Sequence, residues 1–264
     1  MLNENINPYE HLGRLHNEGV EYVINKLNRS SDFEPTRQLV IELTAEFMFL
    51  IDCCGLNIDD YQSKVIRPSN IKYVLFVEFL ANLQVQYGNK SIIELAKEAN
   101  ISVENAGILE MIFNSGTDIE VLPNNAVGNN YQVSLQMLDF LKNRNNTNTA
   151  ISKDEKRAIG IVTSIAHSSI KKGEEIVKDP VLVQKYESVN SHALATSPVI
   201  PNDKTKKFRW PWKADAEGAL SGLISGGIGG ALVGPAGAAV GELLGAVGGS
   251  ISNSVIKSIP FFNS

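Results

Sequence analysis

The C-terminal part of the chain contains, from Gly218 to Gly249, the sequence GALSGLISGGIGGALVGPAGAAVGELLGAVGG. This stretch holds 12 of the 21 glycines. Most of them recur at every fourth residue in two runs, which are Gly218, Gly222, Gly226, Gly230 and Gly234, then Gly237, Gly241, Gly245 and Gly249. A glycine costs a water-exposed helix about 1 kcal/mol relative to alanine, so a solvated helix gains nothing from the repeat. Small residues at this spacing let helix backbones pack closely, in a bilayer or in a tight helix pair.

Pro235 divides the two glycine runs, because proline ends one helix and suits the first turn of the next. A single unbroken helix would be about 60 Å long, roughly twice the hydrocarbon thickness of a bilayer. We therefore predict a helical hairpin over 214–264, with Asp215 as the cap of its first arm. Each arm then has a glycine face and an opposite aliphatic face. We expect the glycine faces to pack on one another or on copies of the chain, and the latter would make a homo-oligomer.

Glu242 is the only ionisable residue between Gly218 and Gly249. In one interpretation it lies near the hairpin tip and reaches the lipid headgroups. In the other it is a gating acid, which points into an assembly and controls insertion through its protonation.

A basic and aromatic segment precedes the hairpin. Residues 196–213 are rich in Ser, Pro and Lys, as in a linker. Basic and tryptophan residues beside an apolar segment are typical of a membrane interface. The residues predicted for such an interface are Lys206, Lys207, Arg209, Trp210, Trp212 and Lys213. Alternatively, this is a surface linker whose tryptophans pack on the preceding domain.

The chain before residue 196 predicts a domain of amphipathic helices, because apolar residues recur there at helical spacing. Ser69 and Ser102 are suitable N-caps, a short helix is predicted from Ser91 to Asn100, and Glu155 makes a capping box with Ser152. We expect loops over 116–130 and 143–148. No alternating strand pattern of useful length occurs. The predicted fold is all-α: a multi-helix domain over 1–195, a basic and tryptophan-containing linker over 196–213, and the glycine-zipper hairpin.

Composition limits the classes of partner and compartment. The formal charge of −5 argues against a nucleic-acid partner, which requires a basic surface. Cys53 and Cys54 are the only cysteines and lie in an apolar run, so they predict buried reduced thiols and a cytoplasmic origin. The first residues have neither a basic region nor an apolar core, and we expect no signal peptide. A protein that leaves the cell would then use a non-classical route.

No catalytic, cofactor-binding or metal-binding motif is recognisable. His11 and His16 are five residues apart, so on a helix they diverge by about 140° and cannot bind one metal together. The default expectation for them is a solvated helix face. Gly227, Gly229 and Gly230 resemble a dinucleotide loop but follow no strand. We predict a protein that is not an enzyme.

The glycine repeat over about 214–259 resembles the glycine-zipper membrane segments of pore-forming bacteriocin-like peptides and of small bacterial envelope proteins. The wider pattern, with Asn7-Pro8-Tyr9 near the start and Lys213-Ala214-Asp215-Ala216-Glu217-Gly218-Ala219 at the zipper entrance, is similar to a group of uncharacterised bacterial helical proteins. A large helical domain before the zipper distinguishes this chain from leader-bearing bacteriocins.

These patterns lead to two functional hypotheses. In the first, a non-enzymatic bacterial protein carries a hairpin that associates with or inserts into membranes, as a toxin, effector or pore-forming element shielded by the helical domain. Its partners are the lipid bilayer and an unknown delivery protein. In the second, the protein is a soluble scaffold or assembly protein whose hairpin packs helices without lipid.

Overall fold

The computed structural model describes residues 7–29, 36–54, 71–120, 130–195, 208–231 and 235–259. These residues form ten helices and one pair of two-residue strands, so the prediction of an all-α fold is confirmed. The elements are α1 (Glu10–Arg29), α2 (Arg37–Cys54), α3 (Ile71–Tyr87), α4 (Ile92–Glu98), α5 (Val103–Ser115), β1 (Ile119–Glu120), α6 (Asn130–Thr147), α7 (Lys153–Lys178), α8 (Pro180–Ala195), β2 (Arg209–Trp210), α9 (Trp212–Ala231) and α10 (Pro235–Ser258).

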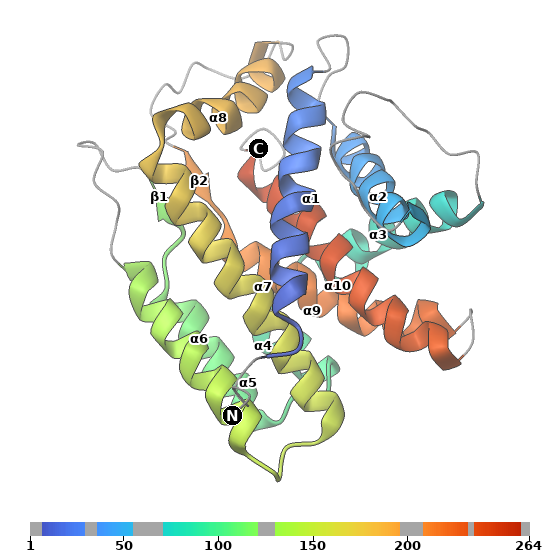
Figure 1. Ribbon diagram of the computed structural model, residues 1–264, viewed down its shortest axis with the longest axis vertical. Coiled ribbons are helices and arrows are strands. Elements are labelled where there is room, and N and C mark those ends of the chain that lie inside the picture. The colour runs from blue at the N-terminus through green and yellow to red at the C-terminus, as the bar shows by residue number, and fades with distance from the viewer. Residues whose placement is uncertain are drawn as a thin grey trace.

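The last two helices, α9 and α10, form an antiparallel pair that we call the glycine hairpin (Figure 1). Helix α10 packs against α1, α2, α3 and α7, and helix α9 packs against α3, α4 and α7. Helices α1 and α7 lie side by side over the hairpin (Figure 1). The predicted C-terminal unit is therefore in contact with most of the predicted N-terminal domain, and the two share one hydrophobic core.

Serine side chains begin three of the helices as their sequence predicts. Ser91 starts α4 with a full capping box, in which the Glu94 carboxylate accepts a bond from the Ser91 amide. Ser102 and Ser152 cap α5 and α7. The capping box predicted at Ser152 is incomplete, because the Glu155 carboxylate accepts hydrogen bonds from the Ser102 amide and the Asn105 side chain instead. Ser69 lies outside the described residues.

Helix α6 continues to Thr147, so the loop predicted over 143–148 is wrong. Asparagine disfavours helix interiors because its side chain competes for backbone hydrogen bonds. Here Asn145 donates instead to the Lys156 carbonyl of α7, and Arg144 pairs with Glu104 of α5. These contacts between helices keep the polar end of α6 helical.

The strand pair β1–β2 was not expected from the sequence. Ile119 pairs with Trp210 and Glu120 with Arg209, in antiparallel register. Each strand has only two residues, which is too short to show the alternation of apolar and polar side chains by which a strand is recognised in a sequence. This pairing brings the chain onto the helical domain immediately before α9. The linker predicted over 196–213 is thus shorter, since β2 and the start of α9 occupy its last residues.

Candidate functional site

Three pairs of glycines face each other across the glycine hairpin. A Cβ atom built on Gly218, Gly222 or Gly226 would overlap the carbonyl oxygen of Gly249, Gly245 or Gly241, respectively. The obstacle in each case is backbone, which cannot turn away as a side chain does. The two helices therefore pack backbone to backbone, at a separation that only glycine permits.

The other predicted packing glycines lie farther along the hairpin. Gly230 is in α9 and Gly237 is in α10, whereas Gly234 lies outside the described residues. In each of the three described pairs, both glycines belong to the same chain and pack on one another. Assembly of several copies through these faces would require the hairpin to open first.

The aliphatic face of the glycine hairpin is covered by the helical domain. Leu220, Val247 and Ile251 are buried in the common core. Ile251 fits against Gly19 of α1, where an added Cβ would strike it. The opposite end of the hairpin, where α9 leads into α10, projects beyond the other helices (Figure 1). The hairpin thus has an enclosed stem and a projecting tip.

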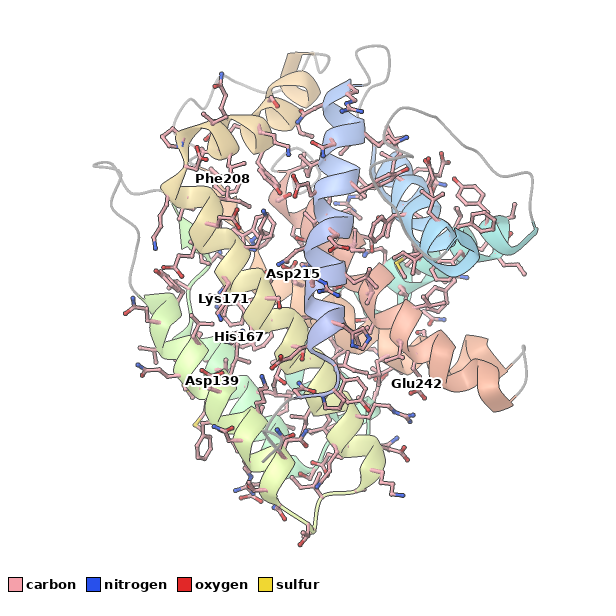
Figure 2. The ribbon with its side chains drawn as sticks, in the orientation of Figure 1. Asp139, His167, Lys171, Phe208, Asp215 and Glu242 are labelled. Atoms are coloured by element: carbon pink, nitrogen blue, oxygen red, sulfur yellow. The ribbon has the colours of Figure 1, made fainter. Side chains whose placement is uncertain are left out.

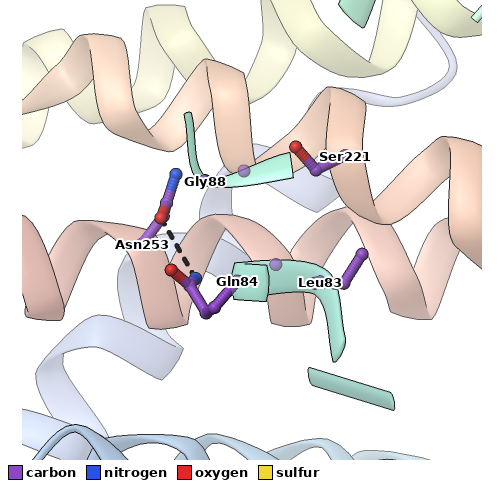
Figure 3. Close-up of a pocket in the computed structure, with 7 residues that line it drawn as sticks. Leu83, Gln84, Gly88, Ser221 and Asn253 are labelled. Carbon is purple, nitrogen blue, oxygen red and sulfur yellow. Dashed lines mark hydrogen bonds between the residues drawn. The ribbon is translucent and has the colours of Figure 1, made fainter. Parts of the chain in front are cut away.

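A cavity of about 10 Å³ lies beside the Gly218–Gly249 pair (Figure 3). Its remaining lining residues are Leu83, Gln84, Gly88, Ser221 and Asn253. The Gln84 amide donates to Asn253 Oδ1 at 3.1 Å, and Asn253 Nδ2 donates to the Ala214 carbonyl at 2.9 Å. A space of this size matches one water molecule, so it is too small for an organic substrate.

Four buried side chains from four elements meet at the start of α9, and we call them the anchor network: His16, Ser169, Trp210 and Asp215. The Trp210 indole donates to Ser169 Oγ at 2.8 Å, and the Ser169 hydroxyl donates to Asp215 Oδ2. Asp215 Oδ2 lies 3.5 Å from His16 Nε2, and both side chains are 0% exposed. Asp215 occupies the centre of the molecule (Figure 2). The network joins α1, α7, β2 and α9 at one carboxyl group.

Burial changes the proton affinity of both ionisable members of the anchor network. It raises the pKa of Asp215 to about 8, although the hydrogen bond from Ser169 opposes the rise. It lowers the pKa of His16 to about 4, although a hydrogen bond with Asn17 opposes the fall. Both shifts favour the neutral forms, because a charge loses its hydration in the interior.

The anchor network corrects two sequence predictions. His16 does not lie on a solvated helix face but is fully buried, and Asp215 is not the cap of α9 but lies inside its first turn. The apolar residues around His16 on α1, including Leu12, Gly19 and Val20, were the available signal that this face is internal. The pairing itself joins positions about 200 residues apart, which no local spacing encodes.

The residues predicted for a membrane interface separate into two groups. Trp210 and Trp212 are buried, with Trp212 donating to the Thr117 carbonyl at 2.9 Å and packing edge-on against Phe113. This matches the alternative interpretation, in which the tryptophans pack on the helical domain. Arg209 is exposed and pairs with Asp118 at 2.6 Å, and Lys213 is half-buried. Lys206 and Lys207 lie outside the described residues.

Glu242 lies where the glycine hairpin meets helix α7. Its Oε2 lies 3.1 Å from Arg157 Nε of α7, and its side chain is 17% exposed. Burial raises the pKa of Glu242 above its usual range, while Arg157 opposes the rise. Glu242, the predicted gating acid, therefore forms an ion pair that joins α10 to α7. Figure 2 shows it at the base of the projecting part of the hairpin.

The other histidines of the described side chains form no catalytic set. His167 Nε2 lies 3.5 Å from Asp139 on the outer side of α7 (Figure 2), and His11 bonds to the Pro8 carbonyl. Within the described residues, no three His, Cys, Asp or Glu side chains gather as a set of metal ligands. In the same part of the chain, no helix has both the length and the apolar character that a membrane crossing needs.

Comparison with known proteins adds no relative: no family description, no curated protein and no solved structure matches the chain.

Proposed function

We propose that this chain is a non-enzymatic protein in which a helical domain carries a glycine hairpin in a shielded form, for delivery to a membrane. The observation that carries the proposal is the backbone-to-backbone packing of the three glycine pairs. Such packing needs neither lipid nor a second copy of the chain, so the two arms can stay paired when the hairpin leaves the domain.

The arrangement of the domain around the hairpin supports the same proposal. Helices α1, α2 and α7 cover the aliphatic face, and the hairpin tip stands clear of them. A hairpin held in this way is protected from water until the contacts at its stem break. The polar contacts that would have to break include the Arg157–Glu242 ion pair, the anchor network and the hydrogen bond from Gln84 of α3 to Asn253 of α10.

A second candidate function is helix packing without lipid, as in a scaffold or assembly protein. Buried polar residues on α10 favour it, because Ser250, Ser252 and Asn253 would be expensive to expose to hydrocarbon. The buried, hydrogen-bonded tryptophans favour it too.

Two glycine variants of the full chain separate these functions. Gly19→Leu would push α1 away from Ile251 without touching the glycine pairs, whereas Gly222→Leu would force α9 and α10 apart. We expect Gly19→Leu to increase co-sedimentation with vesicles of mixed zwitterionic and anionic lipid, and Gly222→Leu to reduce it. Dye release from the same vesicles distinguishes a pore from an anchor.

The membrane proposal fails if neither the unmodified chain nor Gly19→Leu sediments with vesicles above the lipid-free control. Packing without lipid then remains. Circular dichroism of each variant establishes that it is helical before the comparison is made.

A further inference from the structure

The anchor network lies where the glycine hairpin joins the rest of the molecule. Asp215 belongs to the first turn of α9, and its carboxyl group contacts α1 through His16 and α7 through Ser169. The other polar contacts at this end do not reach α1 or α7: the Trp212 indole donates to the Thr117 carbonyl, and Asn253 of α10 bonds to the Ala214 carbonyl and to Gln84 of α3. The anchor network is therefore the described polar connection between the start of the hairpin and helices α1 and α7.

We propose that His16 and Asp215 form a proton-linked latch, which holds the start of α9 against α1 and α7 and releases it when Asp215 loses its proton. The inference deepens the proposed function, since it names the step that frees the stem of the hairpin.

The direction of the pH effect follows from the proton count of the closed and open forms. In the closed form Asp215 keeps its proton up to about pH 8, and His16 stays neutral down to about pH 4. In the open form water surrounds both groups, so Asp215 loses its proton near pH 3.8 and His16 near pH 6.5. Between about pH 4 and 6.5 the pair holds one proton in each form, so the pair itself does not make the equilibrium depend on pH.

Above about pH 6.5 the two forms differ. The open form has lost its proton, whereas the closed form retains one on Asp215 until about pH 8. Because the pKa of Asp215 in the closed form and that of His16 in the open form are only about 1.5 units apart, opening is favoured roughly tenfold across the whole interval, and the effect ends once the closed form also loses the proton. The pair therefore stabilises the closed form over the open form most strongly at mildly acidic pH.

The charged groups around the latch do not replace it. Asp118, which precedes β1, and Glu217 of α9 both act on Asp215 and raise its pKa further. Asp118 is itself paired with Arg209 of β2. Lys213 and Lys257 act on Glu217, and burial raises the pKa of Glu217 to about 6. On α7 and α10 the neighbouring groups are the hydroxyls of Ser169 and Ser254, which do not titrate in this range.

Hydrogen exchange of the full chain, followed by mass spectrometry without lipid, tests the latch. After correction for the intrinsic exchange rate, we expect the opening constant of the first half of α9 to rise roughly tenfold between about pH 6.5 and 8 and then to level off. Amides at the C-terminal end of α6, which contacts α5 and α7 through Arg144 and Asn145, are the internal control and stay level. This series needs no substitution.

Two variants assign the effect to the pair. Asp215→Asn keeps the side-chain shape but cannot ionise, so its α9 opening should be level above about pH 6.5. His16→Gln removes the compensating group, so between about pH 5 and 6.5 opening should rise more steeply than in the unmodified chain. Glu217→Gln is the matched carboxylate control and keeps the rise between about pH 6.5 and 8.

The latch is refuted if opening of α9 in the unmodified chain is level through that interval, or if Asp215→Asn keeps the rise. Because no lipid is present, this outcome is separate from the vesicle experiment. A chain with the exchange transition but without vesicle binding would retain the latch and lose the membrane function.

Discussion

One hydroxyl group satisfies two buried groups from different elements. Ser169 Oγ accepts a hydrogen bond from the Trp210 indole and donates one to Asp215, and all three side chains are buried. Removal of a shared partner leaves each former neighbour without its hydrogen bond, and a buried unsatisfied group costs about 1–3 kcal/mol. A small side chain thus influences β2 and α9 together.

Ser169→Ala should therefore lower the free energy of unfolding by about 3 kcal/mol, because it leaves both the indole and the carboxyl group unsatisfied. Urea unfolding at mildly acidic pH measures the change. Ser250→Ala is the matched control: the Ser250 hydroxyl is equally buried but donates only to the Val247 carbonyl of its own helix. Ser250→Ala should lower the free energy of unfolding by less than about 1 kcal/mol, since the Val247 carbonyl keeps its backbone hydrogen bond within the helix. Equal losses in the two variants would contradict the role given to Ser169.

At the scale of the helix, the glycine hairpin depends on three positions where no side chain fits. The obstacles opposite Gly218, Gly222 and Gly226 are backbone atoms of α10. Any added carbon must therefore move a whole helix. Elsewhere in the core, such as Gly248 against Leu80 and Met48, the neighbours are side chains that can adjust.

Gly222→Ala should lower the free energy of unfolding by about 1–3 kcal/mol, the usual range for an overpacked core. Gly107→Ala in α5 is the control, because nothing lies within 4 Å of the added carbon. That variant should be more stable than the unmodified chain by up to about 1 kcal/mol, from helix propensity alone. Thermal unfolding of the two variants should show stability changes of opposite sign. A stabilising effect of Gly222→Ala would contradict the close helix pair.

Much of the element scale could be predicted from the sequence. The glycine period and Pro235 predict a hairpin with its break where α9 ends and α10 begins, and Ser91, Ser102 and Ser152 mark real helix starts. These features are local, so a short window of residues contains the information. The extension of α6 was missed because contacts with α5 and α7 overcome the low helix propensity of asparagine.

The site could be predicted only in part. The glycine faces follow from the period, but the anchor network joins residues from four distant segments and has no local signal. The prediction that Trp210 and Trp212 lie at a membrane interface rests on composition alone. Composition does not distinguish a tryptophan at a bilayer from one whose indole N–H finds a buried partner, such as Ser169 for Trp210.

At the scale of the molecule, the glycine hairpin and the helical domain share one core. Sequence composition divides the chain into a domain over 1–195 and a hairpin over 214–264. In the structure, residues of the hairpin such as Val247 and Ile251 belong to the same buried cluster as Val23 and Phe47. Elements that share a core unfold together.

We therefore expect one cooperative unfolding transition. The only two tryptophans, Trp210 and Trp212, lie at the entrance of the hairpin, whereas far-UV circular dichroism reports all helices. Thermal midpoints from tryptophan fluorescence and from circular dichroism should coincide, because loss of the hairpin removes the core of the domain. Two separated midpoints would show instead that the hairpin is an independent unit.

The central place of the glycine hairpin also affects how the chain is made. On the ribosome, α1 and α2 are synthesised about 200 residues before the helix that fills the space between them and α7. At roughly 5–20 residues per second, their inner faces wait about 10–40 s for α10. During that time the nascent chain carries apolar surface that α10 covers only in the finished molecule.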